Sequence, residues 1–247
     1  MNKIIVALDV ETAAEAGEII GELKDSVGAF KIGLQLFTAA GASFVRETVA
    51  SGVKVFLDLK FHDIPNTVAK ASVEAARTGV WMFNLHALGG GEMMTRAVEQ
   101  VRETCEKEGL IQPKIIGVTV LTSSNEETLR EVGIEREVDS QVVSLARLCE
   151  KSGLDGVVAS PLEIGAIRES VLNQDFLIVT PGIRSQAAEI ENRNSKNRFE
   201  TYDDQKRVMT AGEAVRAGAN YLVVGRPILR AKDRRAAARK ILEEISF

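Results

Sequence analysis

Short runs of apolar, often β-branched residues alternate along this chain with longer stretches rich in Ala, Glu, Arg and Leu. Short apolar runs are typical of buried strands, whereas longer amphipathic stretches are typical of helices. Eight runs are expected to be strands: Ile4–Asp9, Phe30–Gly33, Val53–Lys60, Trp81–His86, Lys114–Leu121, Gly156–Ser160, Phe176–Pro181 and Tyr221–Gly225. Because a helical stretch follows each run, the sequence predicts repeated strand–helix units.

This repeat predicts an α/β fold of one kind, a single (β/α)8 TIM barrel. Eight units in 247 residues give about 31 residues each, in agreement with the ~250 residues typical of this barrel. We expect one catalytic domain over residues 1–247. The competing fold is a doubly wound open sheet, but its G-x-G-x-x-G fingerprint is missing after the first strand, where Asp9-Val10-Glu11-Thr12 stands.

One long segment interrupts the repeat. Between Gly182 and Val208 the chain is polar, charged and nearly free of large apolar residues. Loops of this length in compact domains are commonly lids, and the loops after strands seven and eight of TIM barrels commonly hold phosphate. We therefore expect a phosphate-side lid loop at about residues 183–207.

Charged residues occupy strand positions that should face the barrel interior. Alternate residues of a strand share a face. In the run Val55–Lys60, the alternate set that begins with Val55 is entirely apolar and meets the helices, so the other set, which includes Asp58 and Lys60, points inward. The same alternation turns Asp9 and Lys31 inward on the first two strands. Four charges from three adjacent strands should therefore converge at the carboxyl ends of the strands, where TIM barrels carry their catalytic groups.

A self-balancing ion pair or solvent exposure would explain any one of these residues. For four together that explanation weakens, because burying each ion costs several kcal/mol and apolar replacements are often neutral or stabilising. A lysine held among carboxylates remains a cation that can donate a proton or stabilise negative charge. His62 and His86 are further acid–base candidates, although a hydrogen-bonded structural role is the favoured interpretation of both.

Composition excludes several other classes. The formal charge of −4 offers no basic field for nucleic acid or an anionic membrane, and no apolar run approaches the ~18 residues of a membrane span. Cys105 and Cys149 lack CxxC spacing, and with only two histidines they do not make a tetrahedral metal site. The start, MNKIIVALDV, is too short in apolar residues for a signal peptide. We expect a cytoplasmic protein with no metal.

One segment resembles a family signature. The run Asp58-Leu59-Lys60-Phe61-His62-Asp63-Ile64-Pro65-Asn66-Thr67 is similar to that of the orotidine 5′-phosphate decarboxylases, in the ribulose-phosphate-binding barrel group. Six shorter matches follow the same order along the chain: Ala7-Leu8-Asp9, Lys31-Ile32-Gly33, Val120-Leu121-Thr122-Ser123, Pro181-Gly182-Ile183-Arg184, Asp204-Gln205-Lys206-Arg207 and Val224-Gly225-Arg226-Pro227-Ile228. Ten contiguous residues with six ordered matches are strongly specific.

The resemblance implies cofactor-independent decarboxylation of orotidine 5′-monophosphate to uridine 5′-monophosphate and carbon dioxide, in de novo pyrimidine biosynthesis. Lys60 would be the proton donor within an array of Lys31, Asp58, Lys60 and the partner subunit's Asp63, so that a homodimer shares its active sites. Asp9 and Lys31 would hold the ribose hydroxyls. The other residues implied to bind substrate, besides Asp58, are Ile64, Thr67 from the partner chain, Thr122, Pro181, Arg184, Gln205, Gly225 and Arg226.

Three alternatives remain open. The nearest is a metal-dependent sugar-phosphate decarboxylase or aldolase on a related barrel, which can share the D-x-K-x-x-D spacing of Asp58, Lys60 and Asp63. The second is a Schiff-base aldolase that uses Lys60, although paired carboxylates disfavour the neutral amine that such chemistry needs. The third, from a different class, is a non-catalytic nucleotide-binding barrel.

Overall fold

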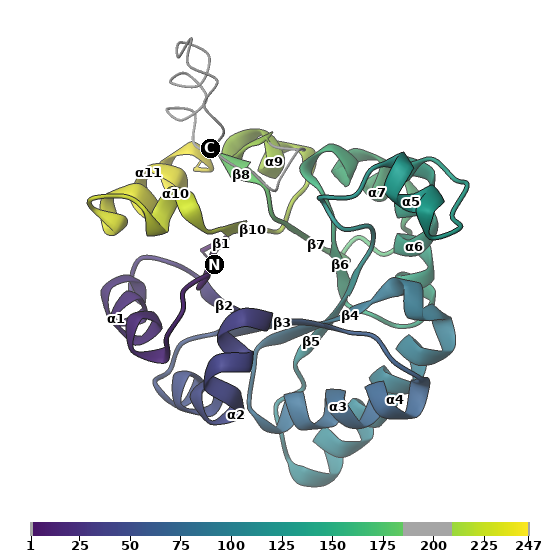
Figure 1. Cartoon of the computed structure of the whole chain (residues 1–247), viewed down its shortest axis with the longest axis horizontal. Coiled ribbons are helices and arrows are strands. Elements are labelled where there is room, and N and C mark those ends of the chain that lie inside the picture. The colour runs from purple at the N-terminus through teal and green to yellow at the C-terminus, as the bar shows by residue number, and fades with distance from the viewer. Residues whose placement is uncertain (1, 185–208, 247) are drawn as a thin grey trace.

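A computed structural model describes residues 2–184 and 209–246. Eight parallel strands close into a barrel in the order β1-β10-β7-β6-β5-β4-β3-β2, and the helices surround it (Figure 1). The strands are β1 (Ile4–Ala7), β2 (Ala29–Gly33), β3 (Val55–Phe61), β4 (Met82–His86), β5 (Lys114–Val118), β6 (Gly156–Val158), β7 (Leu177–Thr180) and β10 (Tyr221–Val224). This closed barrel confirms the predicted fold class and excludes the open sheet.

The helices alternate with the strands as the sequence predicts. They are α1 (Ala13–Leu23), α2 (Leu34–Ala50), α3 (Pro65–Arg77), α4 (Gly90–Glu108), α5 (Glu126–Glu131), α6 (Val138–Lys151), α7 (Ile164–Ser170), α9 (Ala211–Ala217), α10 (Arg226–Leu229) and α11 (Arg234–Glu244). Two 3₁₀ turns, η1 (Ala87–Gly89) and η2 (Pro161–Glu163), precede α4 and α7. All eight predicted strands are present, and their ends differ by at most three residues from those expected.

A short second sheet stands beside the barrel. Strand β8 (Ile183–Arg184) pairs in parallel with β9 (Met209–Thr210). The expected lid at 183–207 thus begins in a strand, and its residues from 185 onward lie outside the described residues.

The two faces of the barrel sheet each carry an apolar layer. The interior layer contains Ile5, Ala7, Ala29, Phe56, Met82, Ile116, Val179 and Val223. A larger layer between strands and helices contains Val55 and Leu57, with Leu59 packed against it. Strand alternation therefore turns Phe56 inward and its neighbours outward, as predicted.

The two ends of the barrel differ in chemistry. Trp81 and Tyr221, at the amino ends of β4 and β10, make an edge-to-face contact with ring centroids 5.0 Å apart. Lys54 lies over the Trp81 ring, with its Nζ 5.5 Å from the centroid. Aromatic packing of this kind favours stability at that end. The polar site residues lie at the opposite end, where the strands have their carboxyl ends. Across the described residues, no helix is long and apolar enough to cross a membrane.

Candidate active site

The carboxylate of Asp58 lies between two lysine ammonium groups at the carboxyl ends of β2 and β3. Its Oδ1 is 2.7 Å from Lys60 Nζ, and its Oδ2 is 3.3 Å from Lys31 Nζ. Lys31 also contacts Asp9, with Nζ 3.4 Å from Oδ1. The structure thus brings together four expected site residues from three adjacent strands.

Burial makes these attractions strong. The side chains of Lys31 and Asp58 are only 12% and 13% exposed, whereas that of Asp9 is 61% exposed. Burial alone would lower the pKa of Lys31, but the Asp58 and Asp9 carboxylates outweigh it, and the pKa is raised above its ordinary value. Burial likewise would raise the pKa of Asp58, but Lys31 and Lys60 hold that pKa below its ordinary value. Both groups therefore stay charged at neutral pH.

The backbone of Lys60 is unusual. Among the described residues, Lys60 is the only non-glycine with positive φ, at 51°. The pairing of β3 with β4 also shifts register between Leu57 and Phe61. Left-handed backbone in a residue with a long side chain is sterically costly and persists where surrounding contacts hold it.

Asn84 on β4 provides such contacts, and sequence reasoning missed it. Its side-chain oxygen accepts a hydrogen bond from the Lys60 N–H at 2.8 Å, and its Nδ2 donates to Asp58 Oδ1 at 2.7 Å. The residue is fully buried. The available signal was a polar residue on the inward face of an apolar strand, since Asn84 shares its face with Met82.

Gly225 lies beside Asp9 where β10 meets β1. A Cβ added to Gly225 would stand 3.3 Å from the Asp9 Oδ2 and 3.5 Å from the Ala7 Cβ. Arg226 follows as the exposed first residue of α10. The last strand therefore ends next to the charged cluster.

Asp63, Ile64 and Thr67 extend away from this cluster. All three are exposed, and Ile64 is 67% exposed. The Asp63 carboxylate accepts a hydrogen bond from the Ile64 N–H at 2.6 Å. Among the described residues, Lys60 forms an ion pair with Asp58 and none with Asp63 of the same chain.

Two other expected residues lie on loops at the same end of the barrel. Thr122 is half-buried in a turn after β5, and Pro181 is half-buried directly after β7. The backbone of Arg184 belongs to β8. Gln205 lies outside the described residues.

His62 and His86 stack on each other near Lys60. Their ring centroids are 5.4 Å apart and the rings are inclined by 24°. His86 Nδ1 accepts a hydrogen bond from the Leu88 N–H at 3.4 Å. Burial, followed by the nearby His62 and Lys60, lowers the pKa of His86 to about 4. His86 is therefore neutral at physiological pH.

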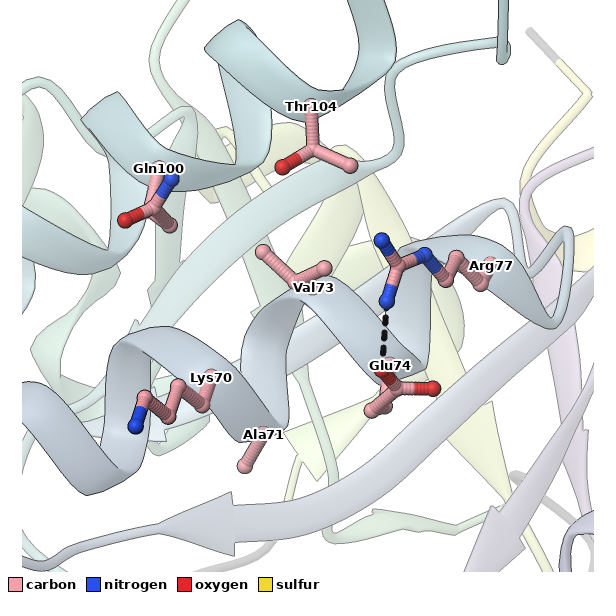
Figure 2. A pocket seen from close by; sticks show the side chains of 7 residues that line it. All are labelled: Lys70, Ala71, Val73, Glu74, Arg77, Gln100 and Thr104. Atoms are coloured by element: carbon pink, nitrogen blue, oxygen red, sulfur yellow. Dashed lines mark hydrogen bonds and ion pairs between the residues drawn. The ribbon is translucent and has the colours of Figure 1, made fainter. Parts of the chain in front are cut away.

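A recess on the outer surface between α3 and α4 contains none of the expected site residues (Figure 2). Its lining residues are Lys70, Ala71, Val73, Glu74, Arg77, Gln100 and Thr104. Arg77 is held there by ion pairs with Glu74 at 2.6 Å and Glu108 at 2.5 Å. Within residues 2–184 and 209–246, no group of three His, Cys, Asp or Glu residues could hold a metal ion.

A closed parallel barrel with two lysines around a largely buried carboxylate at the carboxyl ends of its strands defines a class, the TIM-barrel enzymes that work with fixed charges. Comparison with known proteins narrows this class. The family model described as "Orotidine 5'-phosphate decarboxylase / HUMPS family" matches residues 2–241. The chain belongs to this family, and it is an enzyme of the carboxy-lyase class.

Individual relatives agree over nearly the whole chain. An orotidine 5′-phosphate decarboxylase of Geobacter sulfurreducens is 56% identical over 244 residues, which cover 99% of this chain and 96% of the relative. One from Syntrophotalea carbinolica is 53% identical over 245 residues, covering 99% and 95%. The crystal structure of orotidine 5′-phosphate decarboxylase from Lactobacillus acidophilus matches with a TM-score of 0.83 and 35% identity, covering all of both chains.

The depressed pKa of His86 predicts a pH dependence of stability. The pKa of His86 is about 4 in the folded chain, whereas the pKa of histidine in an unfolded chain is ~6.5. Between these values the unfolded chain binds more protons, so the free energy of unfolding should fall as the pH drops through this window. The chain has only two histidines, so NMR titration resolves both imidazoles. His86→Gln should remove the low-pH titration, whereas His62→Gln should keep it. Two midpoints near the ordinary value would contradict the prediction.

Proposed function

We propose that this enzyme decarboxylates orotidine 5′-monophosphate to uridine 5′-monophosphate and carbon dioxide, without a cofactor, in de novo pyrimidine biosynthesis. The observation that carries the proposal is the Asp58 carboxylate held between Lys31 and Lys60 at the carboxyl ends of the strands. Relatives of 53% and 56% identity that bear the decarboxylase name support the choice of substrate. The proposed cytoplasmic location fits Cys105 and Cys149, which are both free thiols.

The reaction breaks the bond between the substrate carboxylate and the pyrimidine ring. Carbon dioxide leaves without the bonding electron pair. This pair stays on a ring carbon, and the pyrimidine cannot readily delocalise it. The Lys60 ammonium stabilises this charge and then donates a proton to the carbon, so that a C–H bond replaces the C–C bond. Lys60 regains its proton from solvent after product release. A fixed cation in a water-poor site stabilises such a charge far more than it would in bulk water.

The acids serve to hold the cation. Asp58 and the partner subunit's Asp63 hold the Lys60 ammonium in place and direct it at the ring, and Lys31 balances the second oxygen of Asp58. The 2.7 Å contact between Lys60 and Asp58 supports this role. Carboxylates facing the substrate carboxylate also disfavour the bound ground state.

The remaining residues bind the rest of the nucleotide. Asp9 and Lys31 hold the ribose, joined by Thr67 of the partner subunit, and Ile64 contributes to the same wall. Thr122 contacts the edge of the pyrimidine and Pro181 packs against it. The phosphate is bound by the Gly225 backbone and by three side chains, Arg184, Gln205 and Arg226. In this proposal residues 1–247 form one catalytic domain whose lid, 183–207, closes over the phosphate and excludes water.

A homodimer completes the proposed site. Large apolar side chains are exposed after four successive strands of the barrel, β2 to β5: Leu34 at 57%, Ile64 at 67%, Leu88 at 42% and Leu121 at 41%. Because these strands are neighbours in the barrel, the four side chains share one sector of its rim. Exposed apolar surface of this kind is typical of a protein interface. Asp63, Ile64 and Thr67 belong to the same sector.

Lys60→Ala should abolish turnover while leaving the nucleotide bound. Losing both the fixed cation and the proton donor should lower kcat for orotidine 5′-monophosphate by about 10⁴-fold or more. Ultraviolet absorbance follows the loss of substrate, and calorimetry with uridine 5′-monophosphate measures binding. Lys70→Ala, an exposed lysine on α3, is the matched control and should keep wild-type kinetics. Substantial turnover by Lys60→Ala would remove Lys60 from its role, and loss of wild-type activity in EDTA would favour the metal-dependent alternative.

Shared sites predict rescue in mixed dimers. When Lys60→Ala and Asp63→Ala chains associate at random, half of the dimers carry one intact site of two, which restores about a quarter of wild-type activity. Activity is measured after the chains are unfolded together and refolded. A mixture of Lys60→Ala with Asp58→Asn is the matched control and should remain inactive, because both changes lie in the same chain's half of the site. Failure of the first mixture, in verified heterodimers, would show that the sites are not shared.

A further inference from the structure

We propose that Asn84 is a positioning residue: its buried amide holds the Asp58 carboxylate and the left-handed backbone of Lys60 in one arrangement, and thereby aims the Lys60 ammonium at the substrate. This inference deepens the proposed function and rests on it. Asn84 reaches the reaction only through Asp58 and Lys60, which its two hydrogen bonds join.

The first argument is the irregular pairing of β3 with β4. Leu57 pairs with Phe83 and Phe61 pairs with Leu85, so four steps along β3 correspond to only two along β4. Asn84 is the residue of β4 that faces this extra length. A bulge of this kind re-aims side chains and leaves backbone groups without ladder partners. The side-chain oxygen of Asn84 takes the place of a ladder partner for the Lys60 N–H, at 2.8 Å.

The second argument is the conformation that this hydrogen bond holds. A φ of 51° at Lys60 is sterically unfavourable, and the surrounding contacts must maintain it. In a regular strand, the side chains of Asp58 and Lys60 would both project straight into the barrel. The left-handed turn instead allows the Lys60 ammonium to meet Asp58 Oδ1 at 2.7 Å. Backbone strain at Lys60 is therefore part of what orients its ammonium group.

The third argument is the sharing of one carboxylate oxygen. Asp58 Oδ1 accepts hydrogen bonds from Lys60 Nζ and from Asn84 Nδ2, both at 2.7 Å, while Oδ2 faces Lys31. The amide thus fixes the rotation of the carboxylate and keeps one oxygen for each lysine. Met82 and Ile116 belong to the apolar interior layer, Ile116 pairs with Asn84 between β4 and β5, and Asn84 is fully buried. Losing the amide would leave buried polar groups unsatisfied.

The chain offers a matched control at the opposite end of the barrel. Asn220 also links two elements through its side-chain oxygen, which accepts hydrogen bonds from the Ile178 N–H at 2.8 Å and from the Arg168 guanidinium. It precedes β10 and is remote from the charged cluster. Asn220→Leu should lower stability, as Asn84→Leu should, and should leave kcat for folded protein unchanged.

Steady-state kinetics with orotidine 5′-monophosphate test the role. For Asn84→Leu, which keeps the number and branching of the side-chain heavy atoms and loses both hydrogen bonds, kcat should fall about 100-fold because the ammonium is displaced. Affinity for uridine 5′-monophosphate should stay near that of the wild type. Circular dichroism and thermal unfolding establish that each variant is folded. An active wild type with unchanged kcat in Asn84→Leu overturns the inference, and an inactive wild type overturns the proposed function instead.

Asn84→Asp provides a readout that loss of stability alone would not produce. The new carboxyl keeps the acceptor for the Lys60 N–H, and when protonated it can still donate to Asp58. Ionised, it would face the Asp58 carboxylate, which raises its pKa. The other charged groups around this position are Lys60 on β3 and Lys31 on β2. The titratable group further along β4 is His86, which is neutral in this pH range, and the partner on β5 is Ile116. The kcat of Asn84→Asp should rise as the pH falls from roughly 8 to 6, relative to wild type. A pH dependence of kcat parallel to that of the wild type would contradict the proposal. This test remains decisive even if Asn84→Leu does not fold.

Discussion

The Asp58 carboxylate attracts two lysine ammonium groups at once, and the arrangement of the site depends on this pair of contacts. Without that carboxylate, Lys31 and Lys60 would be adjacent cations in a region of low dielectric, where like charges repel strongly. With it, each lysine ammonium faces its own carboxylate oxygen. A charge that stays in place before the reaction begins requires little reorganisation when negative charge develops on a substrate.

The barrel supplies the rigidity that this arrangement needs. Strands β1, β2 and β3 are neighbours in the closed sheet, so Asp9, Lys31 and Asp58 come from backbones that cannot move apart independently. The apolar interior layer packs beneath them and keeps water away from the base of the cluster. The left-handed backbone at Lys60 is maintained within this frame by Asn84. The fold therefore converts strand pairing into fixed distances between charges.

Much of this could be predicted from the sequence, because a two-residue period decides which side of a strand faces the core. Short apolar runs between longer amphipathic stretches predicted the eight strands, and the two-residue period predicted the inward face of Asp58 and its meeting with Lys31. It could not give the register shift opposite Asn84, since alternation assumes a regular strand, nor the pairing of β8 with β9 across a long segment. The roles of Thr122, Pro181 and Arg226 rest on resemblance and stay predictions, and Gln205 lies outside the described residues.

The most direct test of the central claim is a crystal structure of the enzyme with bound uridine 5′-monophosphate. The account predicts that Lys60 Nζ lies about 3–3.5 Å from the ring carbon that carried the carboxylate, with Asp58 in contact with both lysines. A Lys60 side chain turned away from the ring, with no carboxylate beside it, would contradict the account.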